Sequence, residues 1–116
     1  MEEQTVAGTL DQALANARHW LGRDPRLARE QADEIMRSVG PHPRARFIRA
    51  LADAALDAPT PAIRGLQELI RELPDWRPPH RALADLLAAQ GDGDGAIAAL
   101  RRSLALDARD PGAWLD

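Results

Sequence analysis

The sequence contains no cysteine and no lysine. Without cysteine, the chain can form no disulfide framework, no thiolate metal site and no thiol nucleophile. All 15 cationic side chains are arginines, and together with the frequent alanine and proline this indicates the codon bias of a GC-rich, bacterial genome. The formal net charge is −3, so the chain lacks the basic field that nucleic-acid binding requires.

β-Branched residues are also scarce. The chain has 5 Ile, 2 Val and 3 Thr against 23 Ala and 16 Leu. Because strands favour β-branched side chains and helices favour Ala and Leu, this balance predicts an all-α fold. With 45% hydrophobic and 28% charged residues, the composition is that of a folded chain, and 116 residues are enough for one domain.

Long apolar runs are absent as well. No stretch approaches 18 consecutive apolar residues, so the sequence predicts no membrane-spanning helix. Residues 1–12 contain Glu2 and Glu3 and no apolar run, unlike a signal peptide. We therefore expect a cytoplasmic protein whose partners include neither a membrane nor a nucleic acid.

What the chain does contain is a stripe of residues that recurs twice at a fixed interval. Its members lie at i, i+1, i+4 and i+8, which places them on one face of a helix. The period is about 34 residues, a length typical of helical repeat proteins. The three copies are Ala28, Arg29, Ala32, Met36; Ala62, Ile63, Leu66, Ile70; and Ala96, Ile97, Leu100, Leu104.

Each period divides into two helices. Asp24, Thr60 and Asp94 are expected to cap the second helix of each copy, because short polar side chains accept hydrogen bonds from a helix start. Gly91 suits the position just past a helix end. The pattern predicts helices at about 9–21, 25–39, 43–56, 61–73, 78–90 and 94–107.

The third copy resembles the tetratricopeptide repeat family. The matching residues are Leu83, Ala84, Leu87, Gly91, Ala96 and Leu100. The sequence departs from the family pattern at His80, Ser103 and Ala108, where Trp, Ala and Pro are typical. A further copy opens at Pro111, with Trp114 at the family's Trp position.

This resemblance implies an α-solenoid of about three helix-turn-helix repeats, whose first helices line a concave groove that binds a segment of a partner protein. A weaker likeness links the chain to the repeats that precede bacterial sulfotransferase domains. The implied organisation is a tail at 1–8, a repeat domain at 9–110 with repeats at about 9–42, 43–76 and 77–110, and the start of a fourth repeat at 111–116.

Residues with catalytic or metal-binding potential form no recognised constellation. His19, His42 and His80 lack the i, i+4 spacing of a helical zinc site. The segment 91–95 is rich in Gly and Asp, but it lacks the later ligands of a calcium loop, so we interpret it as a turn between helices. We therefore expect no enzymatic activity, no catalytic residue, no metal site and no cofactor.

Charged residues on two of the first helices form the candidate binding surface. Arg49 and Asp53 are four positions apart on one helix, and Arg81 and Asp85 are four apart on another. If these faces line a groove, they offer alternating charges to a partner. The alternative is a solvated helix face that carries weak intrahelical ion pairs.

Phe47 and Ile48 extend this candidate surface. Neighbouring side chains differ by about 100° around a helix, so one of the two is expected in the core and the other in the groove. The predicted partner-binding residues are Phe47, Ile48, Arg49, Asp53, Arg81 and Asp85.

The function expected from these observations is that of a protein-interaction module. Two alternatives stay open: a non-catalytic repeat segment of a larger enzyme such as a sulfotransferase, and a homodimerisation unit. The homodimerisation unit would use the C-terminal edge of the chain. We expect weak self-association there through the apolar residues Ile97, Leu100, Leu104 and Trp114.

The first prediction concerns metal content. After dialysis, elemental analysis of the purified protein should find less than stoichiometric zinc, because no pair of histidines has ligand spacing. One zinc ion per chain would contradict it.

Overall fold

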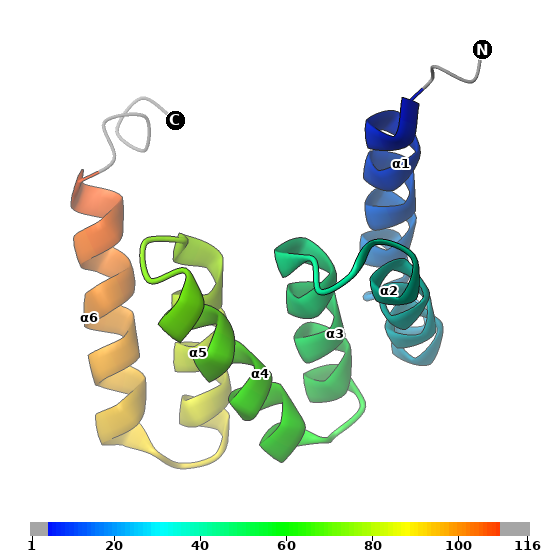
Figure 1. Cartoon of the computed structure of the whole chain (residues 1–116). Coiled ribbons are helices and arrows are strands. Elements are labelled where there is room, and N and C mark those ends of the chain that lie inside the picture. The colour runs from blue at the N-terminus through cyan, green and yellow to red at the C-terminus, as the bar shows by residue number, and fades with distance from the viewer. Residues whose placement is uncertain (1–4, 110–116) are drawn as a thin grey trace. The chain divides into compact units, whose positions relative to one another are not determined.

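The structure is a computed structural model that describes residues 5–109. Within that range the chain forms helices joined by short turns and contains no strand, so the all-α prediction is confirmed (Figure 1). The expected fourth-repeat start at 111–116, with Trp114, lies outside the described residues. The helices are α1 (Thr5–Trp20), α2 (Pro25–Val39), α3 (Pro43–Ala55), α4 (Pro59–Glu72), α5 (Arg77–Ala89) and α6 (Gly93–Arg109).

Two helix starts follow directly from local side-chain chemistry. The Asp24 carboxylate accepts a hydrogen bond from the Leu27 backbone N–H at 3.2 Å and caps α2, as predicted. At the start of α3, the Nδ1 atom of His42 accepts a hydrogen bond from the Arg44 backbone N–H at 3.2 Å. A proline follows each cap at the first helical position, where its missing N–H costs nothing.

The predicted caps Thr60 and Asp94 are wrong. Both residues lie inside the first turn of their helices, because α4 begins at Pro59 and α6 at Gly93. At α6 the capping residue is Asp92, whose carboxylate accepts a hydrogen bond from the Gly95 backbone N–H at 2.9 Å. The helix therefore starts one residue earlier than the sequence pattern indicates.

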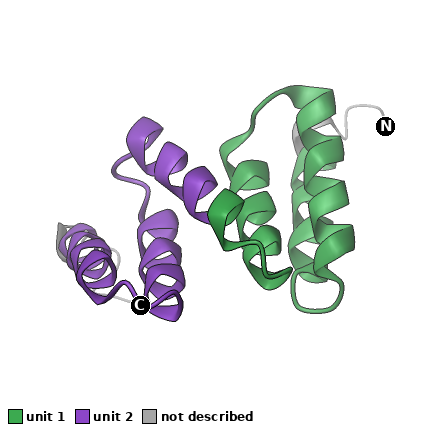
Figure 2. Ribbon diagram, turned by 90° about the horizontal axis from the view of Figure 1, so that it is seen from below, with its two compact units in different colours: residues 1–62 green, residues 63–116 purple. Residues whose placement is uncertain are grey.

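The chain forms two compact units, residues 1–62 and residues 63–116, with the boundary inside α4 (Figure 2). In unit 1, α2 packs against both α1 and α3. Its core consists mainly of small side chains, which let the three helices approach closely. The buried members are Leu14, Ala17, Ala28, Ala32, Ile35, Ala45, Ile48 and Ala52.

In unit 2, α5 and α6 pack against each other as a hairpin. Leu83 and Ala84 on α5 and Ser103 and Leu106 on α6 are buried. His80, at the position where the family has Trp, is also buried, and its Nε2–H donates a hydrogen bond to the Pro74 carbonyl oxygen at 2.8 Å. The hydrogen bond satisfies a polar ring in an otherwise apolar place.

The helices α3 and α5 end in the same way, at corresponding positions of the repeat. In each, the residue after the C-cap has a positive φ: 62° at Asp57 and 85° at Gly91. The next backbone N–H reaches back to close the helix end, from Ala58 to the Asp53 carbonyl at 2.8 Å and from Asp92 to the Leu87 carbonyl at 2.9 Å. Glycine adopts a positive φ without strain, whereas aspartate has a Cβ atom that disfavours it. The aspartate carboxylate also lies at the negative end of the helix dipole, where a negative charge is unfavourable.

The second prediction follows from this difference. Asp57→Gly should stabilise the protein by about 0.5–1 kcal/mol, because it relieves the left-handed conformation and removes a carboxylate from the helix C-terminus. Thermal unfolding followed by circular dichroism should show a midpoint a few degrees higher.

The reciprocal change, Gly91→Asp, is the matched control and should lower the midpoint. A decrease for Asp57→Gly would show that the Asp57 side chain stabilises the turn.

Candidate functional site

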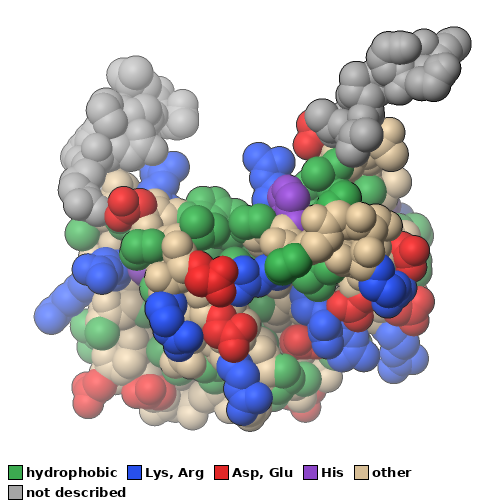
Figure 3. Space-filling view, viewed as in Figure 1, with side chains coloured by type: hydrophobic (Ala, Val, Ile, Leu, Met, Phe, Trp, Pro, Cys, Tyr) green, Lys and Arg blue, Asp and Glu red, His purple; other side chains and the backbone are tan. Residues whose placement is uncertain are grey.

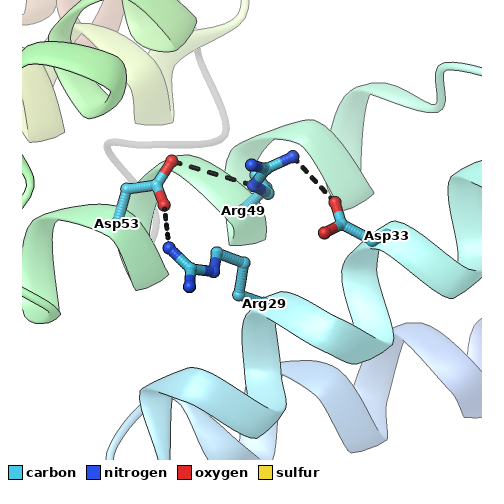
Figure 4. Close-up of polar contacts among 4 residues, drawn as sticks. All are labelled: Arg29, Asp33, Arg49 and Asp53. Carbon is cyan, nitrogen blue, oxygen red and sulfur yellow. Dashed lines mark hydrogen bonds and ion pairs between the residues drawn. The ribbon is translucent and has the colours of Figure 1, made fainter.

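Four charged side chains connect α2 and α3 in unit 1 (Figure 4). The Arg29 Nη1 atom lies 3.2 Å from the Asp53 Oδ1 atom, and the Arg49 Nη1 atom lies 2.8 Å from the Asp33 Oδ1 atom. The Arg49 Nε atom is 3.8 Å from the Asp53 Oδ2 atom, within α3. We call Arg29, Asp33, Arg49 and Asp53 the α2–α3 charge cluster.

Asp53 lies at the centre of this cluster. Its side chain is only 6% exposed, whereas those of Arg29 and Arg49 are 35% and 43% exposed. A buried carboxylate loses its hydration, and the two guanidinium groups offset that loss by charge-assisted contacts. The cluster therefore joins α2 to α3 by alternating charges, where most helix pairs use apolar contacts.

The two adjacent apolar residues on α3 have different environments. Ile48 belongs to the core of unit 1 and is 5% exposed, whereas Phe47 is half-buried. Of the two, Phe47 thus offers more accessible surface to a partner.

On α5, Arg81 and Asp85 lie on an open helix face. Their side chains are 65% and 70% exposed, and the Arg81 Nε atom is 3.4 Å from the Asp85 Oδ1 atom. Pro78, Ala88 and Ala89 are exposed on the same face, at the spacing of successive helical turns. Together these five residues form what we call the α5 face.

The helices α3 and α5 have the same register, since they begin at Pro43 and Arg77, one repeat period apart. In that register Arg49 corresponds to the buried Leu83, and Asp53 to Leu87. Phe47 corresponds to Arg81, and Leu51 likewise corresponds to Asp85. In the repeat register, Arg49 and Asp53 on α3 thus take the place of leucines on α5, Arg81 on α5 takes the place of Phe47 on α3, and Ile48 lies in the core of unit 1.

Sequence reasoning missed Arg29 and Asp33, which pair with α3 from α2. Their pairs join residues 24 and 16 positions apart, so no short-range spacing indicates them. A signal is nevertheless present. The repeat register places two charged residues, Arg49 and Asp53, where the third copy has two leucines.

Figure 3 shows arginine and acidic side chains interspersed over the face in view. Among residues 5–109, no three histidine or acidic side chains are grouped so that they could hold a metal ion. None of the described helices is long and apolar enough to cross a membrane.

Comparison with known proteins supports the repeat assignment. The tetratricopeptide repeat family model matches residues 77–116, which confirms the resemblance in that part of the chain. No curated protein sequence matches the chain.

Solved structures resemble the chain more extensively. The crystal structure of PcrH in complex with the chaperone binding region of PopB has a TM-score of 0.80 at 17% identity, covering 91% of this chain and 86% of PcrH. The structure of MamA has a TM-score of 0.70 at 19% identity, covering 89% of this chain and 61% of MamA. At such low identity the likeness shows the fold, and the expected α-solenoid fold class is confirmed.

The third prediction compares the two Arg–Asp pairs of α3 and α5. Asp53→Ala should destabilise the protein by about 1–3 kcal/mol, because it leaves Arg29 and Arg49 without their shared carboxylate. Asp85→Ala removes an equally spaced but exposed partner and should cost less than about 0.5 kcal/mol. Urea unfolding monitored by circular dichroism measures both.

Equal effects of the two substitutions would contradict the central place of Asp53 in the α2–α3 charge cluster. Added salt should leave most of the Asp53→Ala loss in place, since salt screens exposed pairs more than buried ones.

Proposed function

We propose that this chain, whose residues 77–116 match the tetratricopeptide repeat family, is a non-catalytic module that binds a segment of a partner protein. The observation that carries this proposal is the α5 face, an open surface on the first helix of that repeat. The family's first helices line a concave groove for such segments, and PcrH was crystallised with a bound region of PopB. A cytoplasmic location is part of the same proposal.

The chemistry of the α5 face defines the segment that fits it. Ala88 and Ala89 have short side chains, so a partner backbone can approach closely. Arg81 and Asp85 offer one charge of each sign, and both are largely exposed. An extended segment with small apolar residues and at least one acidic residue matches this surface.

Within unit 1, Phe47 on α3 occupies the register of Arg81 and is proposed as a partner contact of that unit. The α2–α3 charge cluster contributes less to binding in this proposal. A partner that pairs with Arg49 would have to replace the Asp33 carboxylate, and the buried Asp53 offers it little surface. Ile48, in the core of unit 1, positions the helix that carries Phe47.

The fourth prediction tests the α5 face. A partner captured from the source organism with the full chain should bind Arg81→Glu about tenfold more weakly, since the change reverses an exposed charge in the contact. The wild-type affinity should itself fall as salt is added. Isothermal titration with the purified partner measures both effects.

Arg102→Glu is the matched control, because it makes the same charge change at an exposed position of α6. It should leave the affinity unchanged. If Arg81→Glu and Arg102→Glu bind the partner equally well, the binding site lies on another surface.

A further inference from the structure

The helix α6 carries an apolar stripe that no described helix covers. Ile97, Leu100 and Leu104 are 51%, 36% and 56% exposed. They are spaced i, i+3 and i+7, so they lie along one side of the helix. The buried residues Ser103 and Leu106 face α5 instead. We call Ile97, Leu100 and Leu104 the α6 stripe.

The α6 stripe has the spacing of a helix that pairs with another helix. With Gly93, the first residue of α6, its positions are separated by steps of four, three and four residues, which is the a/d spacing of a coiled coil. When two such helices run antiparallel, each a position faces a d position of the other helix. Two copies of α6 would then place Ile97 opposite Leu100 and Leu104 opposite Gly93. A Cβ atom at Gly93 would meet nothing within 4 Å, so a leucine from a second copy has room there.

Two charged residues, Asp94 and Arg101, flank the α6 stripe on the same side. They are seven residues apart, so they lie almost in line along the helix, and each directly follows a d position. Both are exposed, and neither has an ion-pair partner among residues 5–109. The edge of the stripe therefore presents one charge of each sign.

The antiparallel register brings these opposite charges together. Arg101 of one copy and Asp94 of the other are offset along the helix axes by only about 3 Å, whereas the two Arg101 residues are offset by about 7–8 Å. The two-fold symmetry forms the Arg101–Asp94 contact twice. A parallel pair offers Arg101 no counter-charge, because the position that faces it across the seam is Ala96. The charges thus make the stripe complementary to itself in one direction only.

We propose that α6 is a self-association surface, on which a second copy of the chain packs antiparallel through Ile97 and Leu100, with Arg101 of each copy paired to Asp94 of the other. The seam is about three helical turns long, so the self-association is weak and depends on concentration. It uses a different helix from the α5 face, so Arg81→Glu should leave it unchanged.

Charge reversal in separate chains tests the pairing. Asp94→Arg gives one chain two arginines beside the seam, and Arg101→Asp gives another chain two aspartates. Each variant alone should self-associate at least about tenfold more weakly than the wild type, because like charges then face each other. An equimolar mixture of the two variants should associate at least as strongly as the wild type, since every facing pair in the mixed dimer is opposite in charge. Sedimentation equilibrium of the full chains at increasing concentration measures all four samples.

Arg102→Asp is the matched control, because it makes the same charge change at an exposed position of α6 away from the flank of the stripe. It should leave the self-association unchanged. A wild-type chain that stays monomeric up to millimolar concentration would overturn the proposal without the use of any variant. So would self-association that Asp94→Arg and Arg101→Asp both retain, or a mixture of the two that associates no better than each alone.

Discussion

Each helix of this chain is apolar along one side, and two such helices packed as a hairpin still leave one apolar side open to water. The open side is covered only when a further helix packs on it. Unit 1 shows the result, since α2 is held between α1 and α3 and its alanines are fully buried. In unit 2 the described helices end with α6, and its outer leucines stay exposed. The succession of helices therefore determines which surfaces are core and which are free.

The contact between α2 and α3 meets this requirement with charge as well as apolar area. Arg49 and Asp53 stand in the register of Leu83 and Leu87, so one repeat-opening helix carries an ion pair where the other carries leucines. An ion pair needs a complement at a defined position, which Arg29 and Asp33 provide. The leucines need only a surface of suitable shape.

Much of the fold follows from the sequence. The repeating stripe predicts the number and order of the helices, and Asp24 and Gly91 mark ends that the structure confirms. The pattern misplaces the start of α6 because Asp92 and Asp94 are equally good caps by residue type. The choice between them depends on the turn after α5, which ends at Gly91 and directs Asp92 toward the Gly95 N–H.

The candidate surface is less predictable than the fold. Arg49–Asp53 and Arg81–Asp85 have the same i, i+4 spacing, so the sequence alone does not distinguish them. In the structure the first pair faces α2 and the second faces water. The difference arises from tertiary packing, since a side chain 24 positions away supplies the partner of Asp53. Aligning the helices by the repeat register is enough to separate the two faces, because it pairs Arg49 with a leucine and Arg81 with a phenylalanine.

The α2–α3 charge cluster also has a consequence for how the repeats find one another during folding. Repeat proteins contain several similar helices, and a nascent helix can pair with the wrong neighbour. If α3 packed on α6 in the register that it uses on α2, Arg49 would meet Arg101 where Asp33 should be, and Asp53 would face Ile97 in place of Arg29. That arrangement takes the Arg29 guanidinium away from the buried Asp53 carboxylate and brings two arginines together, which costs more than a loss of apolar contact. The cluster thus disfavours the packing of α3 on the second helix of the wrong repeat.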